Sequence, residues 1–464
     1  MKCNFDDTIA AISTPLGKGG IAIVRMSGKD ALFILDKVFK PMGKEKKVFS
    51  LKSHSVTYGY VFDGERIIDE VLLILMLAPK TYTRENVVEI NCHGGVKVVK
   101  SILDVLIKNG ARLAMPGEFT KRAFLNGRID LSQAEAVIDL INAKTELSEK
   151  AALNRLEGRL SEKVRKLREK ILTMTAHIEV NIDYPEHDDE NFSYKLVFEK
   201  TSEILSEVNR LIQTAYMGKV INEGVKTVIL GKPNVGKSSL MNCLLDEERA
   251  IVTDIPGTTR DALEENINVG GIYLNIIDTA GIRATDDIIE KIGVEKSKMY
   301  AENADFIFFV VDSSKELDSE DLEILDFIKK FDKKALVVLN KSDLDKKSDF
   351  NEILKFIDKK YILSVSAKNR VGIDELFDKI KELFFDGEID ANDEVLIANE
   401  RNKLSLINAK KSLENVIETL INKMPQDFLS MDLTDAYSYL GEIVGETLGE
   451  DVIDKIFSEF CLGK

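Results

Sequence analysis

The segment Gly231–Ser238 has the residue types and spacing of a phosphate-binding loop, G-x-x-x-x-G-K-[ST]. It follows an apolar run at residues 227–230 and precedes a helix-like stretch at residues 239–245, the strand–loop–helix context that the motif requires. Its two glycines let backbone N–H groups approach phosphate closely, and the helix N-terminus adds a favourable dipole. Lys237 is then placed to reach the β- and γ-phosphates, and Ser238 to ligate Mg²⁺. The segment predicts a nucleoside triphosphate site.

A second motif predicts which base is bound. Residues 340–343, Asn-Lys-Ser-Asp, follow a strand-like run at residues 335–339. The carboxylate of Asp343 can accept hydrogen bonds from the N1–H and the 2-amino group of guanine, whereas adenine offers neither donor there. A site built on such bonds can reject the wrong base by about 10⁴-fold. A further strand-like run ends at residues 364–368 and is suited to contacting the other edge of the base. We therefore expect the nucleotide to be GTP.

The remaining parts of a GTPase lie between these motifs. Residues 257–261 stand where a switch I loop is expected, with Thr259 placed to complete the Mg²⁺ shell. Residues 276–281 read as a strand that ends in a Walker-B-type Asp278, after which the N–H of Gly281 would meet the γ-phosphate. The residues predicted to contact GTP are Asn234, Val235, Gly236, Lys237, Ser238, Ser239, Gly257, Thr258, Thr259, Asp278, Thr279, Ala280, Gly281, Asn340, Lys341, Asp343, Ser366, Ala367 and Lys368.

The usual group for orienting the attacking water is missing from this sequence. Ras-like proteins carry Gln directly after the Asp-x-x-Gly motif, and Ile282 stands at that position here. Because its side chain cannot hydrogen-bond to water, hydrolysis needs another group, and Arg283 and Glu290 are the nearby candidates. Glu290 equally suits a solvated helix position. Asn234 is a neutral oxygen donor beside the phosphates and is suited to holding a monovalent cation.

Composition and charge set the frame for these motifs. The chain has 464 residues, of which 44% are hydrophobic and 31% charged, as expected for a soluble protein of about two to four domains. The net charge is −15, while residues 1–119 carry 17 Lys/Arg against 13 Asp/Glu, so any RNA contact is expected to be local. The longest apolar run, residues 71–78, is too short for a membrane span. Four scattered cysteines without a C-x-x-C pair predict a reducing, cytoplasmic location and no structural zinc: Cys3, Cys92, Cys243 and Cys461.

The chain divides into regions of different pattern. Residues 1–119 alternate short β-rich runs with Gly and Pro, whereas residues 120–215 and 386–464 show the 3.6-residue periodicity of amphipathic helices. The predicted G domain, residues 216–385, stands between the two helical regions. Because exposed loops accept insertions readily, we predict a multidomain α/β plus α fold: an N-terminal α+β domain and an all-α helical domain into which a Ras-like P-loop G domain is inserted.

Motifs at both ends of the chain resemble a known family. They are Asp-Thr-Ile-Ala-Ala at residues 7–11, Gly-Gly-Ile-Ala-Ile-Val-Arg at residues 19–25, the run from Pro116 to Arg128, residues 130–136 and the terminal Cys-Leu-Gly-Lys at residues 461–464. With these motifs, essentially the whole chain resembles the tRNA-modification GTPases of the MnmE (TrmE) family. The G motifs alone are shared with ribosome-assembly GTPases such as Era and Der.

This resemblance implies a function that the G motifs do not specify. Members act as homodimers with the flavoprotein MnmG, in a heterotetramer, to place an aminomethyl-type or carboxymethylaminomethyl group on C5 of the wobble uridine of tRNA. The N-terminal domain is then expected to dimerise and to bind a 5,10-methylene- or 5-formyl-tetrahydrofolate derivative. By motif, the folate site would contain Arg25, Glu89, Arg128 and Lys464. Many members have Lys where Arg128 stands, which keeps the charge and changes the geometry.

The resemblance also implies roles for residues near the nucleotide and at the chain end. It implies K⁺-assisted hydrolysis on G-domain dimerisation, with K⁺ ligands at Asn234, Thr253, Ile255 and Thr258, and a nucleotide-binding segment that also includes Asp254 and Pro256. Glu290 would orient the attacking water, and the thiol of Cys461 is a candidate catalytic group. From the residues alone, Cys461 equally suits packing on a terminal helix and Lys464 a frayed end.

Two other functions remain open at this point. A ribosome-assembly GTPase of the Era/Der type would bind RNA without a folate site and would sediment with ribosomal subunits. A dynamin-like scaffolding switch would use GTP only to control assembly, and wobble uridines would be modified normally without it. The sequence does not identify the one-carbon donor, the second donor or the tRNA substrates.

Overall fold

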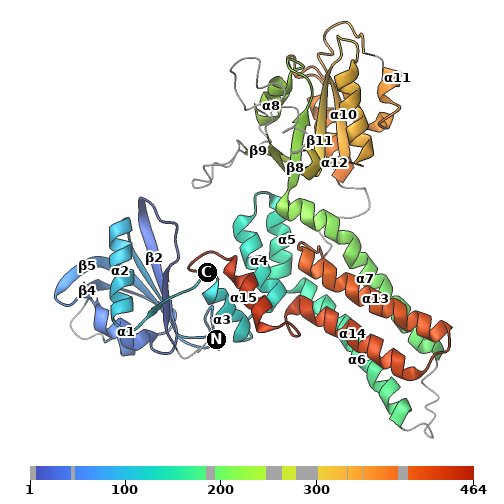
Figure 1. The fold of residues 1–464 in the computed structure, drawn as a ribbon. Coiled ribbons are helices and arrows are strands. Elements are labelled where there is room, and N and C mark those ends of the chain that lie inside the picture. The colour runs from blue at the N-terminus through green and yellow to red at the C-terminus, as the bar shows by residue number, and fades with distance from the viewer. Residues whose placement is uncertain are drawn as a thin grey trace. The chain divides into compact units, whose positions relative to one another are not determined.

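The computed structural model divides into two compact units. The first comprises Met1–Ile138, Leu156–Thr173 and Tyr437–Lys464, and the second comprises Asp139–Arg155 and Met174–Ala436. Figure 1 shows the elements of both units, coloured along the chain. The residues that the structure describes are 7–42, 47–183, 194–246, 264–277, 301–331, 333–348, 350–384 and 395–464.

The N-terminal part of the first unit is a seven-stranded sheet in the order β3-β4-β5-β6-β2-β1-β7. Neighbouring strands run antiparallel, except that β1 and β7 are parallel. The strands are β1 (Ile9–Ile12), β2 (Gly19–Ser27), β3 (Phe39–Pro41), β4 (Ser55–Asp63), β5 (Arg66–Met76), β6 (Val87–Gly94) and β7 (Arg112–Leu113).

Helices α1 (Ala31–Val38) and α2 (Val96–Lys108) cover one face of this sheet, while on the opposite face Phe119 packs on Ile9 and Ala11 of β1. Apolar residues recur at helical spacing along α1 and α2, and they pack with Val24, Leu73 and Ile90 of the strands into one buried cluster. Side chains alternate between the faces of a strand, so the intervening residues lie on the opposite face. There Ile21, Val56 and Leu72 remain 72%, 63% and 48% exposed. Away from β1, the N-terminal sheet thus presents an open face with apolar side chains.

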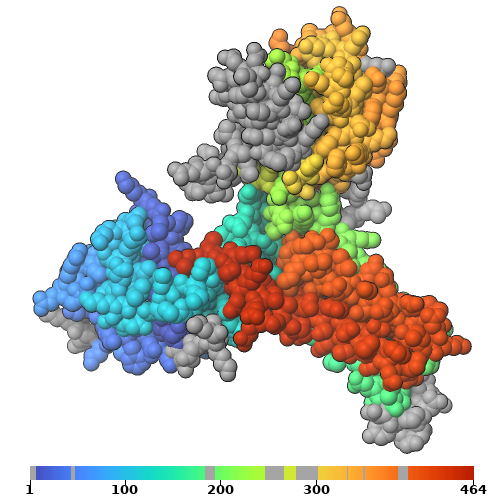
Figure 2. Space-filling view, viewed as in Figure 1, coloured from blue at the N-terminus to red at the C-terminus, as the bar shows by residue number. Residues whose placement is uncertain are grey.

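The C-terminal end of the chain returns to residues far earlier in the sequence. Helix α15 (Glu450–Ser458) packs against α3 (Glu118–Leu125) and the start of α4 (Leu131–Asn142), burying Phe457 and Phe460 with Ala123 and Leu131. Figure 2 shows the C-terminal residues, in red, lying against the cyan residues around α3 and α4. This packing brings the last residues of the chain to the N-terminal domain.

The second unit contains long helices beside the G domain. Helix α7 (Tyr194–Glu223) packs along α13 (Glu400–Ile421), with Ile204 and Val208 of α7 and Leu413 of α13 fully buried. Helices α6 (Arg159–Asp183) and α14 (Gln426–Val444) contribute residues to both units, and α5 (Glu146–Leu156) precedes α6.

The G domain is built on a six-stranded sheet in the order β13-β12-β11-β8-β10-β9. All neighbouring pairs are parallel except β10 and β9. Its strands are β8 (Val225–Leu230), β9 (Glu264–Val269), β10 (Ile272–Ile277), β11 (Phe306–Asp312), β12 (Lys334–Asn340) and β13 (Ile362–Ser364).

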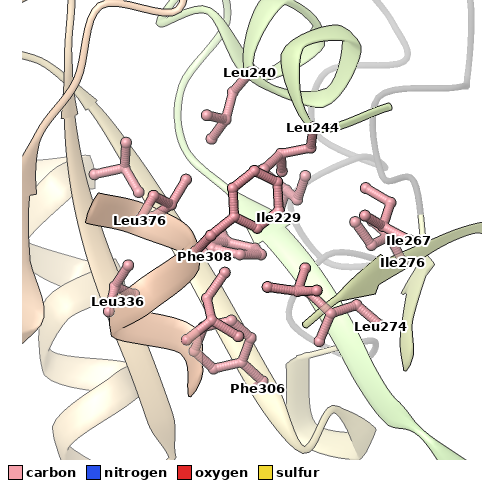
Figure 3. Close-up of a cluster of buried hydrophobic side chains, with 14 of the residues drawn as sticks. Ile229, Leu240, Leu244, Ile267, Leu274, Ile276, Phe306, Phe308, Leu336 and Leu376 are labelled. Carbon is pink, nitrogen blue, oxygen red and sulfur yellow. The ribbon is translucent and has the colours of Figure 1, made fainter. Parts of the chain in front are cut away.

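Both faces of the G-domain sheet are covered by helices, as expected for a parallel sheet. On one face, α8 (Lys237–Asp246) and α12 (Ile373–Phe384) pack on strand residues such as Ile229 and Phe308, as Figure 3 shows for Leu240, Leu244 and Leu376. On the other face, α10 (Ser319–Lys330) and the short α11 (Phe350–Ile353) cover alternate residues of the same strands. The carboxyl ends of the parallel strands are therefore held at one edge.

The structure confirms the predicted fold class. The helical patterns at residues 131–141 and 160–178 lie within α4 and α6, and the run at residues 21–25 lies within β2. The runs at residues 227–230 and 335–339 form the G-domain strands β8 and β12. In the part of the chain that is described, none of the helices has the length and apolarity to cross a bilayer. The domain boundaries at residues 119, 215 and 385 stay predictions.

Gly218 tests how closely the segment after the G domain packs on α7. A Cβ at Gly218 would lie 2.0 Å from the main-chain oxygen of Ile397. In an open helix, Gly→Ala adds about 1 kcal/mol of stability. Here we expect Gly218→Ala to lower the free energy of unfolding by about 1–3 kcal/mol, because the main chain at Ile397 must move. Denaturant titration measures this, and Ser206→Ala on the exposed side of α7 is the control. A gain in stability from Gly218→Ala would contradict the close packing.

Candidate functional site

The phosphate-binding motif forms a strand–loop–helix turn at the carboxyl edge of the G-domain sheet. Strand β8 ends at Leu230 and α8 begins at Lys237, as predicted. Gly231 and Gly236 have φ of +142° and +100°, and a Cβ would lie 2.3 Å from the Val310 oxygen at the first and 2.2 Å from Asn340 Nδ2 at the second. Glycine is therefore required at both positions by backbone conformation and by space.

The lysine of the motif, Lys237, folds back onto the main chain of the loop. The ammonium of Lys237 donates hydrogen bonds to the main-chain oxygens of Gly231 at 2.6 Å and Lys232 at 2.8 Å. Ser238 follows in the first turn of α8, where main-chain N–H groups have no partner within the helix. An ammonium, a hydroxyl and a helix N-terminus thus converge on this loop, which is the chemistry of a phosphate site.

The predicted base-reading residues assemble beside the loop. The hydroxyl of Ser366 donates to Asp343 Oδ1 at 2.6 Å, and this bond is the main reason that the pKa of Asp343 lies below its usual value. Asp343 is therefore a carboxylate at neutral pH, with acceptor capacity left for a base. Because β12 and β13 are parallel neighbours, residues 340–343 and 364–368 leave the sheet at the same edge.

Asn340 joins the two halves of the site. Its Nδ2 donates to the main-chain oxygen of Val235 at 2.9 Å, and its Oδ1 accepts from the N–H of Ala367 at 3.1 Å. The side chain is 2% exposed, so both bonds lie out of water. One buried amide therefore ties the phosphate loop to the segment that faces the base.

The switch residues lie outside the described residues. These are Thr253, Asp254, Ile255, Pro256, Gly257, Thr258 and Thr259, then Asp278, Thr279, Ala280 and Gly281, and the candidates Ile282, Arg283 and Glu290. The elements next to them are described: β9 begins at Glu264, and β10 ends at Ile277, directly before Asp278. Their predicted roles stay predictions.

Three ion pairs around the phosphate loop were not anticipated from the sequence. Lys341 Nζ lies 2.6 Å from Asp312 Oδ2, and Lys232 Nζ lies 2.6 Å from both Asp318 and Asp321. Asp312 is the last residue of β11, in register with Asn340 at the end of β12. The signal that could have found it is an acidic residue that ends an otherwise apolar strand run in a parallel sheet.

The residues predicted for a second site in the first unit also meet. Arg25 on β2 and Glu89 on β6 are cross-strand partners, with their Nη2 and Oε1 atoms 2.7 Å apart and their side chains 18% and 16% exposed. The Arg25 Nη1 atom also donates to the main-chain oxygen of Gly463 at 3.3 Å. This pair lies on the open face of the sheet, at the place where the C-terminal residues return.

Two aromatic rings complete this arrangement. The guanidinium carbon of Arg128 is 4.7 Å from the centre of the Tyr82 ring, and that of Arg25 is 5.9 Å from the same ring and 5.7 Å from the Phe119 ring. The Tyr82 hydroxyl is hydrogen-bonded to Thr120 at 2.9 Å. Each cation gains from the ring face that it meets. Tyr82 and Phe119 were missed because single aromatic residues in a β-rich run look like core residues.

The last four residues are held by main-chain hydrogen bonds. The N–H of Gly117 donates to the oxygen of Cys461, and the N–H of Phe119 donates to the oxygen of Lys464, each at 3.2 Å. Gly463 has φ of +87°, and a Cβ there would lie 2.3 Å from the oxygen of Ile12. The main chain at Lys464 is thus held against the N-terminal domain, and Cys461 is exposed. That Lys464 belongs to a ligand site stays a prediction.

A buried ion network supports the helix that carries Phe119. Arg122 is 1% exposed, and its guanidinium lies within 2.5 Å of Asp7, 3.0 Å of Glu118 and 3.1 Å of Glu85. Burial alone would raise the pKa of Glu118, but hydrogen bonds from Arg112 and Arg122 hold it below its usual value. The network fixes α3 against the start of the chain and the loop before β6.

Comparison with known proteins covers both sites. Residues 8–128 match the family model described as GTP-binding protein TrmE N-terminus, and residues 131–461 match the MnmE helical domain. The tRNA modification GTPase MnmE of Clostridioides difficile (strain 630) is 52% identical over 460 residues, covering 99% of this chain and 100% of that protein. The protein of the same name from Bacillus licheniformis is 49% identical over 462 residues, covering 99% and 100%. A crystal structure of an Aquifex aeolicus Era variant bound to GDP.AlF4- is 31% identical, covers 40% of this chain and 66% of that chain, and has a TM-score of 0.27.

The base-reading loop can be tested by replacing its carboxylate. Asp343→Asn removes one acceptor oxygen and its charge while keeping the side-chain shape, so we expect the preference for guanine over other purine nucleotides to fall by about a hundredfold, or about 3 kcal/mol. Competition binding with fluorescent nucleotides measures this. Asp345→Asn, an exposed neighbour with the same change, should retain the preference. Unaltered selectivity in Asp343→Asn would show that the base is read elsewhere.

Proposed function

This chain belongs to the MnmE family of tRNA modification GTPases, and on that premise we propose that it couples K⁺-assisted GTP hydrolysis to modification of C5 of the wobble uridine of tRNA. We propose that it does so as a homodimer, together with the flavoprotein MnmG, in the cytoplasm. The observation that carries the proposal is that one chain holds an assembled guanine nucleotide site and a separate cationic, aromatic site built from both chain ends.

The described residues fit a GTP–Mg²⁺ complex. Lys237 would exchange its two main-chain partners for phosphate oxygens, and the Asp343 carboxylate would accept from the guanine edge. Ser238, with Thr259 outside the described residues, would ligate Mg²⁺, which prefers hard oxygen ligands. The ion would neutralise charge on the transferred phosphoryl group.

Asn234 fits the proposed role of K⁺ ligand. Its φ is +62°, and its main-chain oxygen accepts from Lys341 at 2.9 Å. Its side-chain amide makes no hydrogen bond within the described part of the chain. The side-chain oxygen Oδ1 can therefore coordinate a cation as a neutral ligand. Thr253, Ile255 and Thr258 would supply the other ligands, and Pro256 would stiffen their loop.

We propose that Glu290 orients the attacking water, because Ile282 cannot. A neutral isoleucine at that position removes the usual hydrogen bond to water. A cation held by Asn234 would supply positive charge beside the phosphates, where an arginine finger acts in other GTPases. Two G domains would pair in the GTP-bound state, and hydrolysis would then drive the pair to open.

The open face of the N-terminal sheet supports the proposed dimer. Ile21, Val56 and Leu72 are each about half or more exposed there, and apolar side chains gathered on one sheet face suit an interaction site. The same face carries the Arg25–Glu89 pair, so a second copy seated on it would cover the second site.

The second site fits a tetrahydrofolate derivative in its chemistry. Arg25 and Arg128 can pair with the carboxylates of a folate glutamate, Glu89 can accept from the pterin N–H edge, and Tyr82 offers a ring face for stacking. The bound cofactor would supply the one-carbon unit. Lys464 would add charge, and the exposed thiol of Cys461 is the proposed catalytic group at the chain end.

The two other functions are less well supported. The family models match residues on both sides of the G domain, including the N-terminal domain that a ribosome-assembly GTPase of the Era/Der type does not need. A scaffolding switch that used GTP only to control assembly would not need the ligand-like cluster around Tyr82.

The proposal predicts the phenotype of a hydrolysis-deficient variant. Glu290→Ala should leave GTP affinity within about twofold and lower turnover by about a hundredfold or more, because general-base and water-positioning groups contribute about 10²–10⁴-fold. In a strain lacking the gene, wild type should restore wobble-uridine modification in digested tRNA, and Glu290→Ala should not. Glu302→Ala, an exposed glutamate of the same domain, is the control. Full modification without the gene would refute the tRNA role, and normal turnover in Glu290→Ala would remove that residue from the mechanism.

The second site predicts folate affinity that depends on Arg25. We expect Arg25→Met to weaken binding of 5-formyl-tetrahydrofolate by about tenfold or more, since a hydrogen-bonded charge pair contributes about 1.5–3 kcal/mol. Isothermal titration of the purified protein measures this. Arg66→Met, at the exposed start of β5, should bind as wild type. Equal affinity in all three proteins would place the folate elsewhere.

A further inference from the structure

The carboxylate of Asp312 is buried at the carboxyl end of β11, beside the nucleotide site, and none of the proposed roles uses it. It is 4% exposed, and its Oδ2 lies 2.6 Å from the ammonium of Lys341. Its Oδ1 accepts from both the N–H and the hydroxyl of Ser314, at 3.1 and 2.7 Å. Both oxygens are therefore engaged, which is what a buried carboxylate requires.

The ammonium of Lys341 has a second partner in the phosphate loop. It donates to the main-chain oxygen of Asn234 at 2.9 Å, so one cation joins Asp312 to that loop. Lys341 and Asn234 both have φ of +62°, in the left-handed region that costs non-glycine residues about 1–2 kcal/mol. Such conformations persist where surrounding contacts hold them, and the bridge supplies a contact to each residue.

The other described ties of the phosphate loop end on different residues. The amide of Asn340 holds the oxygen of Val235, and Lys232 pairs with Asp318 and Asp321 on α10. Among the contacts described for this loop, the hydrogen bond from Lys341 is the one that Asn234 accepts. The conformation of that residue therefore depends on where the Lys341 ammonium is held.

We propose that Asp312 is a positioning residue of the GTPase: it holds Lys341 on the carbonyl of Asn234 and thereby fixes the turn that presents the Asn234 side chain to the phosphates and to a monovalent cation. Without the carboxylate, the flexible lysine can turn to water, and Asn234 loses the contact that maintains its left-handed conformation. The cation part of this inference rests on the proposed function; the effect on the phosphate loop does not.

The test is a thermodynamic cycle with Asp312→Asn and Lys341→Met in the full-length protein. The first readout is the K⁺ concentration that half-maximally raises the affinity of a fluorescent, non-hydrolysable GTP analogue at constant ionic strength. We expect Asp312→Asn to raise it about tenfold and Lys341→Met to raise it at least as much, because Lys341 is also a predicted GTP contact. The double variant should show no change beyond that of Lys341→Met, because both substitutions break one bridge. The second readout, the dissociation rate of fluorescent GDP, should rise about fivefold in the same three variants.

Asp318→Asn is the matched control. It weakens a different ion pair of the same loop while leaving a good helix N-cap on α10, so both readouts should stay within about twofold of wild type. Thermal denaturation checks that each variant is folded, and Lys341→Met, at the more exposed end of the bridge, keeps the test valid where Asp312→Asn is unstable.

Three outcomes overturn the inference. Wild-type values in Asp312→Asn would show that the carboxylate does not act on the loop. Independent, additive effects of Asp312→Asn and Lys341→Met would show that it does not act through the lysine, and a change in Asp318→Asn equal to that in Asp312→Asn would show a general effect of charge. If the wild-type affinity does not respond to K⁺, the proposed cation role fails, and GDP dissociation alone then decides on Asp312.

Discussion

The nucleotide site depends on one buried amide, that of Asn340, which bonds the phosphate loop through Val235 and the base-facing segment through Ala367. These segments are more than a hundred residues apart in sequence, and the parallel sheet alone brings them only to a common edge. An amide has both a donor and an acceptor, so one side chain can satisfy a carbonyl on one side and an N–H on the other. Gly236 is a glycine partly because this amide lies where its Cβ would be. One side chain thus accounts for the glycine at position 236 and joins segments that follow distant strands.

The first unit shows the same principle with the ends of the chain. The packing of α15 on α3 delivers the terminal residues to the open face of the sheet, where Gly463 accepts from Arg25. Helix α3 is in turn held by the buried guanidinium of Arg122 and its carboxylates. Removing one member of such a network costs about 3–5 kcal/mol, because it leaves charges buried without a partner. The Arg25–Glu89 pair on β2 and β6 is therefore supported by a strongly constrained helix.

Much of this arrangement could be predicted from the sequence, and the reasons for the rest are physical. The G-x-x-x-x-G-K-[ST] loop and Asp343 are local motifs whose spacing implies their geometry, and the structure shows the loop between β8 and α8 with Asp343 beside it. Tyr82 acts through contacts between chain segments, so no local pattern marks it. Asp312 is marked locally by its place at the end of an apolar strand run, but its pairing with Lys341 depends on the neighbouring strand. Arg25 and Glu89 could be paired only through family resemblance, because cross-strand register depends on the whole sheet.

In the proposed mechanism, hydrolysis depends on K⁺ and on pairing of two G domains. GTP turnover measured in K⁺ and in Na⁺ at matched ionic strength, over a hundredfold range of protein concentration, tests it most directly. We expect much faster turnover in K⁺ than in Na⁺. The rate per chain should rise with protein concentration until the G domains are fully paired, or should already be high where the dimer is complete. Equal turnover in both salts at every concentration would contradict it and would indicate that an external partner activates hydrolysis.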